Sequence, residues 1–342
     1  MKQVLLFLHP ECLAHETGRH PENPRRLEAI WEALQRASLP RGVSWAQPAP
    51  ATLEQVLRVH RPELVNFIRE LAARGGGPVD ADTVTSARSF DAALIAAGGA
   101  IEAVGHVLSQ PGRRAFALVR PPGHHATPER AMGFCLFNNV AIAVQAALVE
   151  QGLKRVAIVD FDVHHGNGTQ AAFAAEPRVL FCSLHQFPWY PGSGRAEEIG
   201  EGAARGQTVN LPLPAGCGDA VYQAAFERVV VPVVRRFQPE LIVASAGFDA
   251  HWADPLAEMA VSTTGFVTMV RTLASLADEL CQGRLALSLE GGYDRQALAS
   301  SVVAVTTVLA GGEPEDLLGP APGGELKNVD LLLDEVCRLH QI

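Results

Sequence analysis

Residues 156–168 read Val-Ala-Ile-Val-Asp-Phe-Asp-Val-His-His-Gly-Asn-Gly, an apolar run that ends in carboxylates, imidazoles and glycines. The apolar run at its start predicts a buried strand. Because side chains alternate faces along an extended backbone, Asp160, Asp162 and His164 are expected to point the same way. Two carboxylates and an imidazole at the end of a buried strand are costly unless a cation pairs with them. The stretch therefore predicts a divalent metal site.

Further apolar runs predict more strands, and longer stretches of helical periodicity separate them. The strands are expected at 4–8, 115–119, 156–159, 179–184, 241–245 and 285–289. The helices are expected near 24–37, 62–73, 86–108, 139–151, 220–237, 264–281, 294–309 and 329–340. This alternation predicts an α/β fold with a mostly parallel central sheet and helices on both faces. No repeat is visible and residues 75–78 are read as a loop, so residues 1–342 are predicted to form a single domain.

The composition is typical of a soluble globular protein, with 48% hydrophobic and 19% charged residues. The formal net charge of -9 argues against nucleic-acid binding, because phosphate contact needs a basic surface. The amino-terminal apolar run has no small-residue cleavage site, and no apolar stretch approaches the roughly 20 residues that span a bilayer. The six cysteines lack Cys-x-x-Cys spacing, which argues against a disulfide framework or a cysteine zinc site and predicts a cytoplasmic protein.

Polar and glycine residues follow most of the predicted strands. They form Arg-Pro-Pro-Gly-His-His at 120–125, Gly-Phe-Asp-Ala-His at 247–251 and Glu-Gly-Gly-Tyr-Asp at 290–294, beside the opening stretch. In open α/β sheets, ligands bind at the carboxyl ends of the strands. These loops are distant in the sequence and are expected to converge on one site.

Asp162, His164 and Asp249 form an oxygen, nitrogen and oxygen donor set without a thiolate. Zinc accepts such ligands, and three protein ligands leave a position open for water, as in catalytic sites. Iron or manganese would also suit this set. The alternative is that the two aspartates only cap helices or turns, which is a common role of Asp taken singly.

His124 and His125 form a tandem pair on a glycine-containing turn after a predicted strand. A single His is more often a structural residue, but this pair lies in a loop that should meet the second pair, at 164–165. A metal-activated water needs a base to take its proton and an acid to protonate the leaving group, and His suits both tasks at neutral pH. Asp160 and Asn167 are available to orient the two imidazoles by hydrogen bonds.

Tyr293 follows two glycines, which allow the backbone to approach a site closely. A phenol there would donate a hydrogen bond to a developing oxyanion. The alternative is a tyrosine that packs on the surface of a loop. Phe134 and the aromatic residues at 187–191 would wall a narrow channel, or would equally serve as core residues.

Taken together, the motifs resemble the zinc-dependent histone deacetylases and their bacterial relatives, which include acetylpolyamine amidohydrolases. The matching motifs are Pro-Gly-His-His at 122–125, Gly-Phe-Cys at 133–135, Asp-Phe-Asp-Val-His-His-Gly-Asn-Gly at 160–168, Gly-Phe-Asp at 247–249 and Gly-Gly-Tyr at 291–293. They occur in the family's order along most of the chain. The resemblance implies an arginase/deacetylase fold with one catalytic zinc ion held by Asp162, His164 and Asp249.

The resemblance also implies roles for the other residues. His125 would act as general base and acid with Asn167 behind it. His124 would assist electrostatically with Asp160 behind it, and Tyr293 would polarise the substrate carbonyl.

The resemblance further implies a substrate channel and a monovalent cation, whose ligands are partly carbonyl groups. The channel would be formed by Gly133, Phe134 and Tyr190, with Asp82 at the rim and Leu256 where a polyamine-specific relative carries Glu. A structural potassium ion would bind near Asp160, Asp162, His164, Ser183 and Leu184. A second cation site would include the carbonyls of Phe173 and Val179.

Features near the start of the chain resemble the class II branch of the family. These are Cys-Leu at 12–13, His15, His-Pro-Glu at 20–22 and Pro-Arg-Arg-Leu at 24–27. Asn167 stands where class I members carry Asp. The Leu at position 256 argues against a dedicated polyamine enzyme.

Four candidate functions can be weighed against the predicted site residues. The first is metal-dependent removal of acetyl or other acyl groups from lysine side chains of proteins or peptides, and the second is hydrolysis of small acylated amines such as acetylpolyamines. A non-catalytic acyl-lysine binder would be expected to lack a metal ligand or the tyrosine, and this chain has both. An arginase-type ureohydrolase would need a two-manganese site with more Asp ligands. The sequence leaves open whether the chain forms a homo-oligomer.

Overall fold

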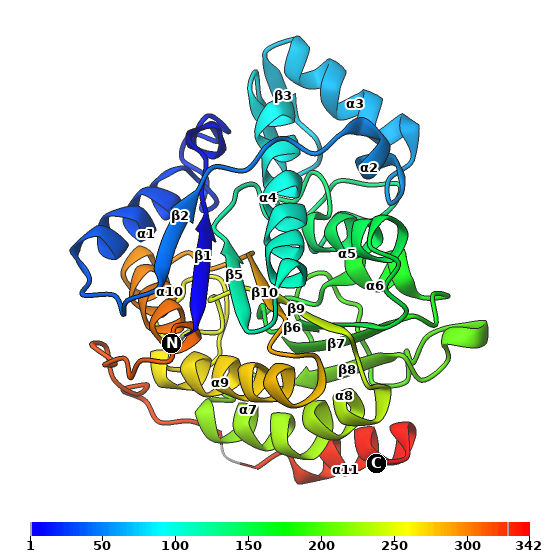
Figure 1. Cartoon of the computed structure of the whole chain (residues 1–342), viewed down its shortest axis with the longest axis vertical. Coiled ribbons are helices and arrows are strands. Elements are labelled where there is room, and N and C mark those ends of the chain that lie inside the picture. The colour runs from blue at the N-terminus through cyan, green and yellow to red at the C-terminus, as the bar shows by residue number, and fades with distance from the viewer. Residues whose placement is uncertain (1, 327) are drawn as a thin grey trace.

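The computed structural model describes residues 2–326 and 328–342, which build an eight-stranded sheet between layers of helices (Figure 1). The strand order is β2-β1-β5-β10-β9-β6-β7-β8, and every neighbouring pair is parallel. The strands are β1 (Gln3–Phe7), β2 (Val43–Ala46), β5 (Arg113–Ala117), β6 (Val156–Asp160), β7 (Val179–Gln186), β8 (Thr208–Leu213), β9 (Leu241–Ala246) and β10 (Leu285–Leu289). The predicted α/β fold is confirmed, and the sheet is parallel throughout.

Two strands of this sheet, β2 and β8, were not predicted from the sequence, and they are its two edge strands. An interior strand of a parallel sheet is covered on both faces and reads as a continuous apolar run, whereas an edge strand need not. In β2, Ser44 and Trp45 are exposed. In β8, Asn210 and Pro212 interrupt the apolar residues, and Pro is tolerated at sheet edges.

All eight predicted helices are present, with one divided by a π-helical turn. They are α1 (Arg25–Arg36), α3 (Pro62–Ala73), α4 (Ser89–Ser109), α5 (Asn139–Glu150), α7 (Asp219–Ala225) leading through η3 (Phe226–Val230) into α8 (Val231–Phe237), α9 (Thr263–Leu280), α10 (Arg295–Leu309) and α11 (Asp330–His340). Short elements that the sequence did not predict are α2 (Leu53–Leu57), α6 (Asn167–Phe173), η1 (Pro10–Leu13) and η2 (Gly202–Ala204). Residues 75–78 are not wholly a loop, because β3 (Gly76–Pro78) pairs antiparallel with β4 (Val84–Ser86).

Helix α4 corrects one expectation, because its 21 residues are long and apolar enough to cross a membrane by length and composition. The helix packs against α5 and β5, and 61% of its most apolar window is buried within the fold. Its glycines permit this packing: a Cβ atom at Gly98 would lie 1.9 Å from the backbone oxygen of Ala49. The composition of α4 is thus that of a core helix in close contact with neighbouring backbone.

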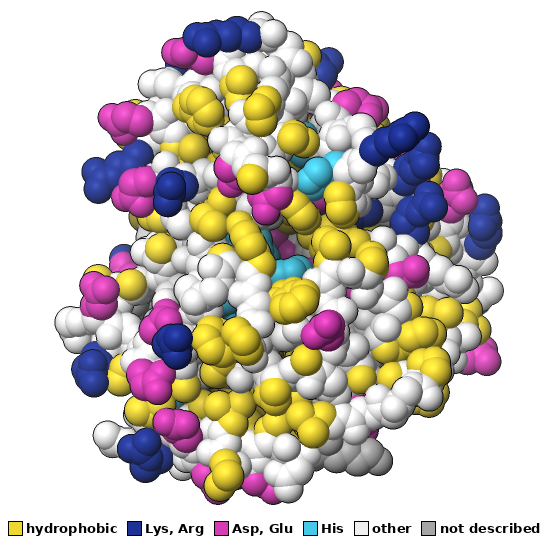
Figure 2. Space-filling view, turned by 180° about the vertical axis from the view of Figure 1, so that it is seen from behind, with side chains coloured by type: hydrophobic (Ala, Val, Ile, Leu, Met, Phe, Trp, Pro, Cys, Tyr) yellow, Lys and Arg dark blue, Asp and Glu magenta, His cyan; other side chains and the backbone are white. Residues whose placement is uncertain are grey.

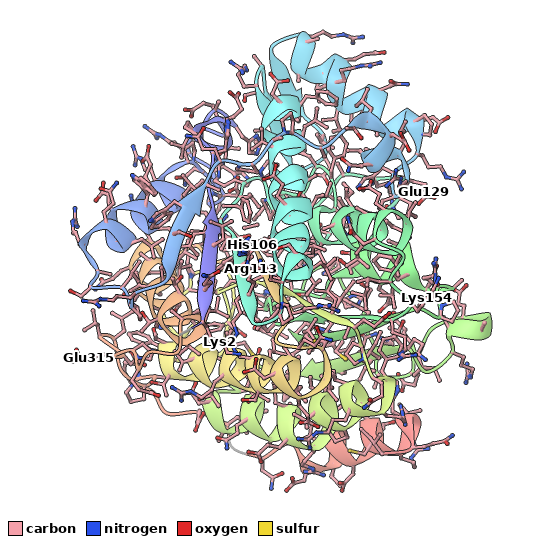
Figure 3. All side chains as sticks on the ribbon, viewed as in Figure 1. Lys2, His106, Arg113, Glu129, Lys154 and Glu315 are labelled. Atoms are coloured by element: carbon pink, nitrogen blue, oxygen red, sulfur yellow. The ribbon has the colours of Figure 1, made fainter. Side chains whose placement is uncertain are left out.

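The loops that carry most of the predicted site residues follow β5, β10, β9, β6 and β7, which are adjacent in the sheet, whereas Asp82 lies between β3 and β4. Parallel strands end at the same edge, so this order brings the five loops together over the centre of the sheet. At the opposite edge lies Val179 of the predicted second cation site, which begins β7. There, Lys2 precedes β1 and Arg113 begins β5, and both are labelled in Figure 3.

Candidate active site

The three predicted metal ligands form a buried cluster at the carboxyl ends of β6 and β9. One ligand atom from each of Asp162, His164 and Asp249 lies within 4.8 Å of the others, and it is the single such cluster found in residues 2–326 and 328–342. The Nδ1 atom of His164 lies 3.2 Å from Oδ1 of Asp162 and 3.1 Å from Oδ2 of Asp249. A tetrahedral zinc ion with bonds of about 2.0 to 2.1 Å would separate its ligand atoms by roughly 3.3 Å, so the spacing fits.

The surroundings of this cluster also fit a metal ion. A single ring nitrogen carries at most one hydrogen and cannot compensate two buried carboxylates, whereas a divalent cation can. Backbone amides orient the carboxylates, since Gly291 donates to Oδ2 of Asp162 at 2.8 Å and Val163 donates to Oδ1 of Asp249 at 2.9 Å. A Cβ atom at Gly247 or Gly291 would lie 2.0 Å from one of these carboxylate oxygens. Glycine is therefore required at both positions beside the cluster.

His124 and His125 are buried beside the cluster, with ring centroids 4.0 Å apart. Nδ1 of His124 lies 3.0 Å from Oδ2 of Asp160, and Nδ1 of His125 lies 2.8 Å from Oδ1 of Asn167. Because a carboxylate or amide oxygen only accepts, Nδ1 is the donor in each bond. Nε2 of a neutral His125 is then left as a proton acceptor.

The pKa values of the two imidazoles shift in opposite directions. Burial by itself lowers the pKa of His124, but the carboxylates of Asp162 and Asp160 outweigh burial and raise it. Burial lowers the pKa of His125 well below its ordinary value, and the positive charge of His124 lowers it further. The arrangement thus favours a cationic imidazole next to a neutral one.

The second tandem pair divides between two environments. His164 belongs to the metal cluster, whereas the ring of His165 turns away from it. Nδ1 of His165 lies 2.8 Å from Oγ of Ser193, and Nε2 lies 2.9 Å from Oε1 of Gln170. His165 therefore has both ring nitrogens in hydrogen bonds within the fold.

The predicted cation ligands also come close together. Asp160 and Ser183 are paired residues of β6 and β7, and Leu184 follows, so all three lie buried beside the metal cluster. Phe173 ends α6 and Val179 begins β7. These placements are consistent with the predicted potassium sites, and potassium binding itself stays a prediction.

The predicted channel residues surround the histidines and the tyrosine. The ring of Tyr190 lies edge-on to His125 with centroids 5.1 Å apart, and the ring of Phe134 lies edge-on to Tyr293 at 5.7 Å. Gly133 adopts a φ of 57°, and a Cβ atom there would lie 2.4 Å from the ring of His125. Figure 2 shows histidine side chains in a hollow bordered mostly by hydrophobic side chains.

Asp82 and Leu256, which were predicted at the rim, are tied to these residues indirectly. The backbone carbonyl of Asp82 lies 2.8 Å from Nε2 of His20, and the ring of His20 packs on Phe134 with centroids 4.5 Å apart. The amide of Leu256 donates to Asp254, whose carboxylate also bonds the amide of Tyr293. Asp82 is therefore linked to Phe134 through His20, and Leu256 is linked to Tyr293 through Asp254.

Several buried charged residues contact the site, although no motif in the sequence assigned them a role. Arg26 donates to the carbonyls of Gly292 and Glu290 at 2.6 Å, and its guanidinium lies 4.8 Å from the ring centroid of Tyr293. The carboxylate of Glu290 accepts from the amides of Gly123 and His124 at 2.6 and 3.1 Å. In the sequence, only their positions within or next to the quoted motifs could have indicated that these residues contact the site.

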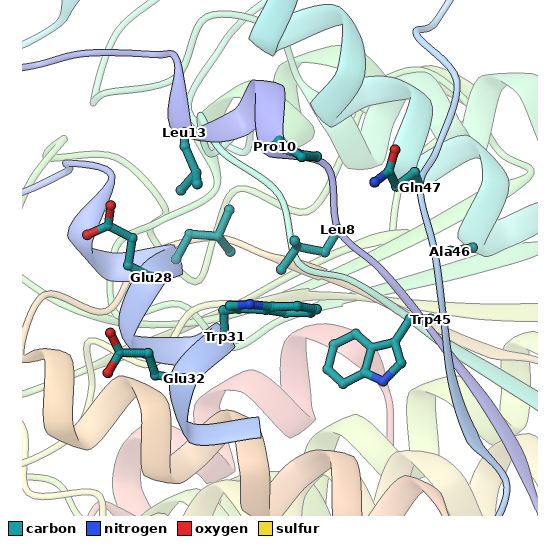
Figure 4. Close-up of a pocket in the computed structure, with 10 residues that line it drawn as sticks. Leu8, Pro10, Leu13, Glu28, Trp31, Glu32, Trp45, Ala46 and Gln47 are labelled. Carbon is teal, nitrogen blue, oxygen red and sulfur yellow. The ribbon is translucent and has the colours of Figure 1, made fainter. Parts of the chain in front are cut away.

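A surface pocket of about 660 Å³ lies apart from these residues (Figure 4). It is mainly apolar and includes the exposed indoles of Trp31 and Trp45, with Glu28 and Glu32 on one side. None of the residues predicted for catalysis, metal binding or the channel lines it. The apolar pocket therefore does not overlap the metal cluster.

Comparisons with known proteins agree with this geometry. The family described as "Histone deacetylase domain" matches residues 20–309. A probable deacetylase of Archaeoglobus fulgidus is 42% identical over 323 residues, covering 92% of this chain and 89% of that protein. A histone deacetylase-like amidohydrolase of Pseudomonas aeruginosa is 40% identical over 334 residues, covering 91% of this chain and 87% of that protein.

The fold is similar to a solved structure of the same family. The crystal structure of the HDA15 HD domain superimposes with a TM-score of 0.89 at 35% sequence identity, covering 99% of this chain and 94% of that one. The match includes the whole central sheet, and the buried Asp-His-Asp cluster lies at the edge where the family motifs converge. This chain therefore belongs to the histone deacetylase family and is a hydrolase with an Asp-His-Asp metal site.

Proposed function

We propose that this protein removes acetyl groups from lysine side chains of proteins or peptides, and that residues 1–342 act as a single deacetylase domain. One observation carries the proposal: a neutral His125 lies between the metal cluster and the ring of Tyr190, and Tyr293 lies against the ring of Phe134. A channel walled by Phe134 and Tyr190 would suit the extended alkyl chain of an acyl-lysine, which is apolar between its two polar ends.

Asp162, His164 and Asp249 would hold zinc, which supplies a Lewis acid for the acyl carbonyl and lowers the pKa of water. In the proposed mechanism Nε2 of His125 accepts a proton from the attacking water. It later donates that proton to the departing amine nitrogen. Asn167 keeps the hydrogen on Nδ1 and so presents Nε2 to the substrate.

His124 and Tyr293 act on the negative charge that develops on the acyl oxygen. The carboxylates of Asp162 and Asp160 raise the pKa of His124 and so favour its cationic form, which places a positive charge beside the reacting centre. Burial raises the pKa of Tyr293 well above its ordinary value, so its phenol stays protonated and donates a hydrogen bond. We also propose a structural potassium ion beside Asp160 and Ser183.

One rim position, Leu256, supports acyl-lysine rather than acetylpolyamine as the substrate. A polyamine carries a second ammonium group, which a carboxylate at position 256 would recognise. Position 256 is Leu, whose backbone is fixed by Asp254 and by the indole of Trp189 at 2.9 Å. An apolar side chain at this position offers no partner to a distal ammonium group.

The test compares purified, zinc-loaded protein on acetyl-lysine peptides and on acetylputrescine, with Tyr293→Phe as the matched control. We expect a higher kcat/KM on the peptides. We also expect a loss of about 10²- to 10³-fold in kcat when the phenol is removed, which is typical of one oxyanion donor. A preference for acetylputrescine would overturn the substrate, and near wild-type turnover by Tyr293→Phe would overturn the mechanism.

A further inference from the structure

The loop that carries Tyr293 has nearly every backbone polar group in a specific bond. The bonding partners come from three parts of the chain: the end of β9 with the segment after it, the segment after β6 and helix α1. The amide of Glu290 donates to the Ala246 carbonyl at 3.0 Å, Gly291 donates to Asp162 at 2.8 Å and accepts from the Phe248 amide at 3.0 Å, and Gly292 accepts from Arg26 at 2.6 Å. The backbone is therefore fixed up to the residue before Tyr293.

Asp254 completes this set. Its Oδ2 atom accepts from the amide of Tyr293 at 2.6 Å and from the amide of Asp294 at 3.2 Å. Its Oδ1 atom accepts from the amide of Leu256 at 3.0 Å. One carboxylate thus joins the backbone of the catalytic loop to the segment that was predicted to form the rim.

Burial of the Asp254 carboxylate costs free energy unless hydrogen-bond donors surround it. The residue is 7% exposed, and none of the ion pairs within residues 2–326 and 328–342 includes it. Backbone amides and the amino end of α10, which begins at Arg295, offset the cost of burying this negative charge. Burial and the charge of Asp249 raise the pKa of Asp254 to about 7, and the amides of Tyr293, Leu256 and Asp294 act in the opposite direction by bonding its ionised form. These three amide bonds define the local backbone.

We propose that Asp254 is a positioning residue for Tyr293. The ring of Tyr293 contacts Arg26 and Phe134, which limit its side-chain rotation. Those contacts do not fix the Cα atom from which the phenol projects. Asp254 fixes it through the amide of Tyr293 itself, and so sets the distance from the phenol to the metal cluster. The inference rests on the proposed role of Tyr293.

The experiment is a double-mutant cycle between Asp254→Ala and Tyr293→Phe, with kcat and KM measured on an acetyl-lysine peptide. In the wild-type background we expect Asp254→Ala to lower kcat about 10- to 100-fold, because a misplacement near 1 Å costs about 10²-fold, and to change KM less than about threefold. In the Tyr293→Phe background, Asp254→Ala should lower kcat no further, since the phenol that it positions is gone.

A matched control is Asp316→Ala. Asp316 also accepts backbone amides with both oxygens, from Leu318, Gly319 and Thr264, and it lies outside the site. Its loss should leave kcat within about twofold of wild type. Zinc content and thermal unfolding of every variant report whether metal binding and the fold are kept.

Two outcomes overturn the proposal. The first is an equal loss of kcat in both backgrounds, which would mean that Asp254 acts independently of Tyr293. The second is an unchanged kcat in folded Asp254→Ala. Should Asp254→Ala fail to fold, Asp254→Asn keeps the shape and one acceptor oxygen, and its smaller loss is tested in the same two backgrounds. Full activity of Tyr293→Phe alone would instead refute the proposed function, so the two failures are distinguishable.

Discussion

His124 and His125 are neighbours in the chain with ring centroids 4.0 Å apart, yet their surroundings shift their pKa values in opposite directions. Both rings are buried, and burial lowers the pKa of each. The difference lies in the charges around each ring: the carboxylates of Asp162 and Asp160 raise the pKa of His124, whereas the charge of His124 lowers the pKa of His125, whose Nδ1 bonds the amide oxygen of Asn167. Two identical side chains thus acquire different protonation states from the charges that surround them.

The largest expected effect comes from removing the neutral ring. His125→Ala should lower kcat about 10³-fold, because general acid and base catalysis contributes about 10²- to 10⁴-fold. His124→Ala should cost less, since it removes a charge and leaves the proton acceptor in place. The measurement is kcat for both variants with zinc content determined in parallel. Equal losses of kcat in the two variants would contradict the different roles proposed for the two rings.

The next effect comes from removing the charge behind His124. Asp160→Asn should lower kcat/KM about 10- to 100-fold, as is typical for residues that support a metal or catalytic group. The amide keeps the hydrogen bond but no longer favours the imidazolium, so the pKa of His124 falls. Activity is measured at saturating potassium, so that weakened cation binding does not contribute. Unchanged activity would show that the charge on His124 is dispensable.

A smaller effect comes from giving His125 the partner that His124 has. Asn167→Asp places a carboxylate at Nδ1 and should raise the pKa of His125. A base is lost when it is protonated, so the acidic limb of the kcat/KM profile should move to higher pH while activity at alkaline pH changes little. The profile is recorded from about pH 5 to 9. An acidic limb that stays in place would mean that His125 is not the group being titrated.

The smallest effect on catalysis is expected at His165, which repeats the tandem pattern without facing the substrate. His165→Ala should leave kcat within about tenfold of wild type and destabilise the fold by about 0.5 to 1.5 kcal/mol, because two half-buried partners, Ser193 and Gln170, each lose a hydrogen bond. Urea unfolding measures the stability. A loss of activity as large as that of His125→Ala would place His165 in the reaction.

The sequence predicted the inner strands and the residues whose chemistry is unusual for a core. Asp162, His164 and Asp249 are costly in a buried position without a cation, and that cost is evident from the residue types and their order alone. The roles of the two histidines came from a family resemblance rather than from spacing. The edge strands β2 and β8 were not predicted, because neither has a continuous run of apolar residues.

The contacts of Asp254, Glu290 and Arg26 could not be predicted, because they bind backbone groups. Every residue has a backbone carbonyl and nearly every residue an amide hydrogen, so a sequence does not mark which of them a side chain will meet. Such bonds depend on the distance between loops that follow different strands. This distance is set by the packing of the entire sheet, and local patterns do not contain it.

The five strands that lead to the site are contiguous, and the outermost strands β2 and β8 contribute no predicted site residue. The segments next to β2 nevertheless reach the site: Arg26 of α1 lies before β2 and bonds the carbonyl of Gly292, and Asp82 lies after β2 and bonds His20, which packs on Phe134. Changes in length on either side of β2 would therefore displace groups that hold the catalytic loop or the rim. The outermost strands themselves lack site residues, whereas the connections around β2 do not.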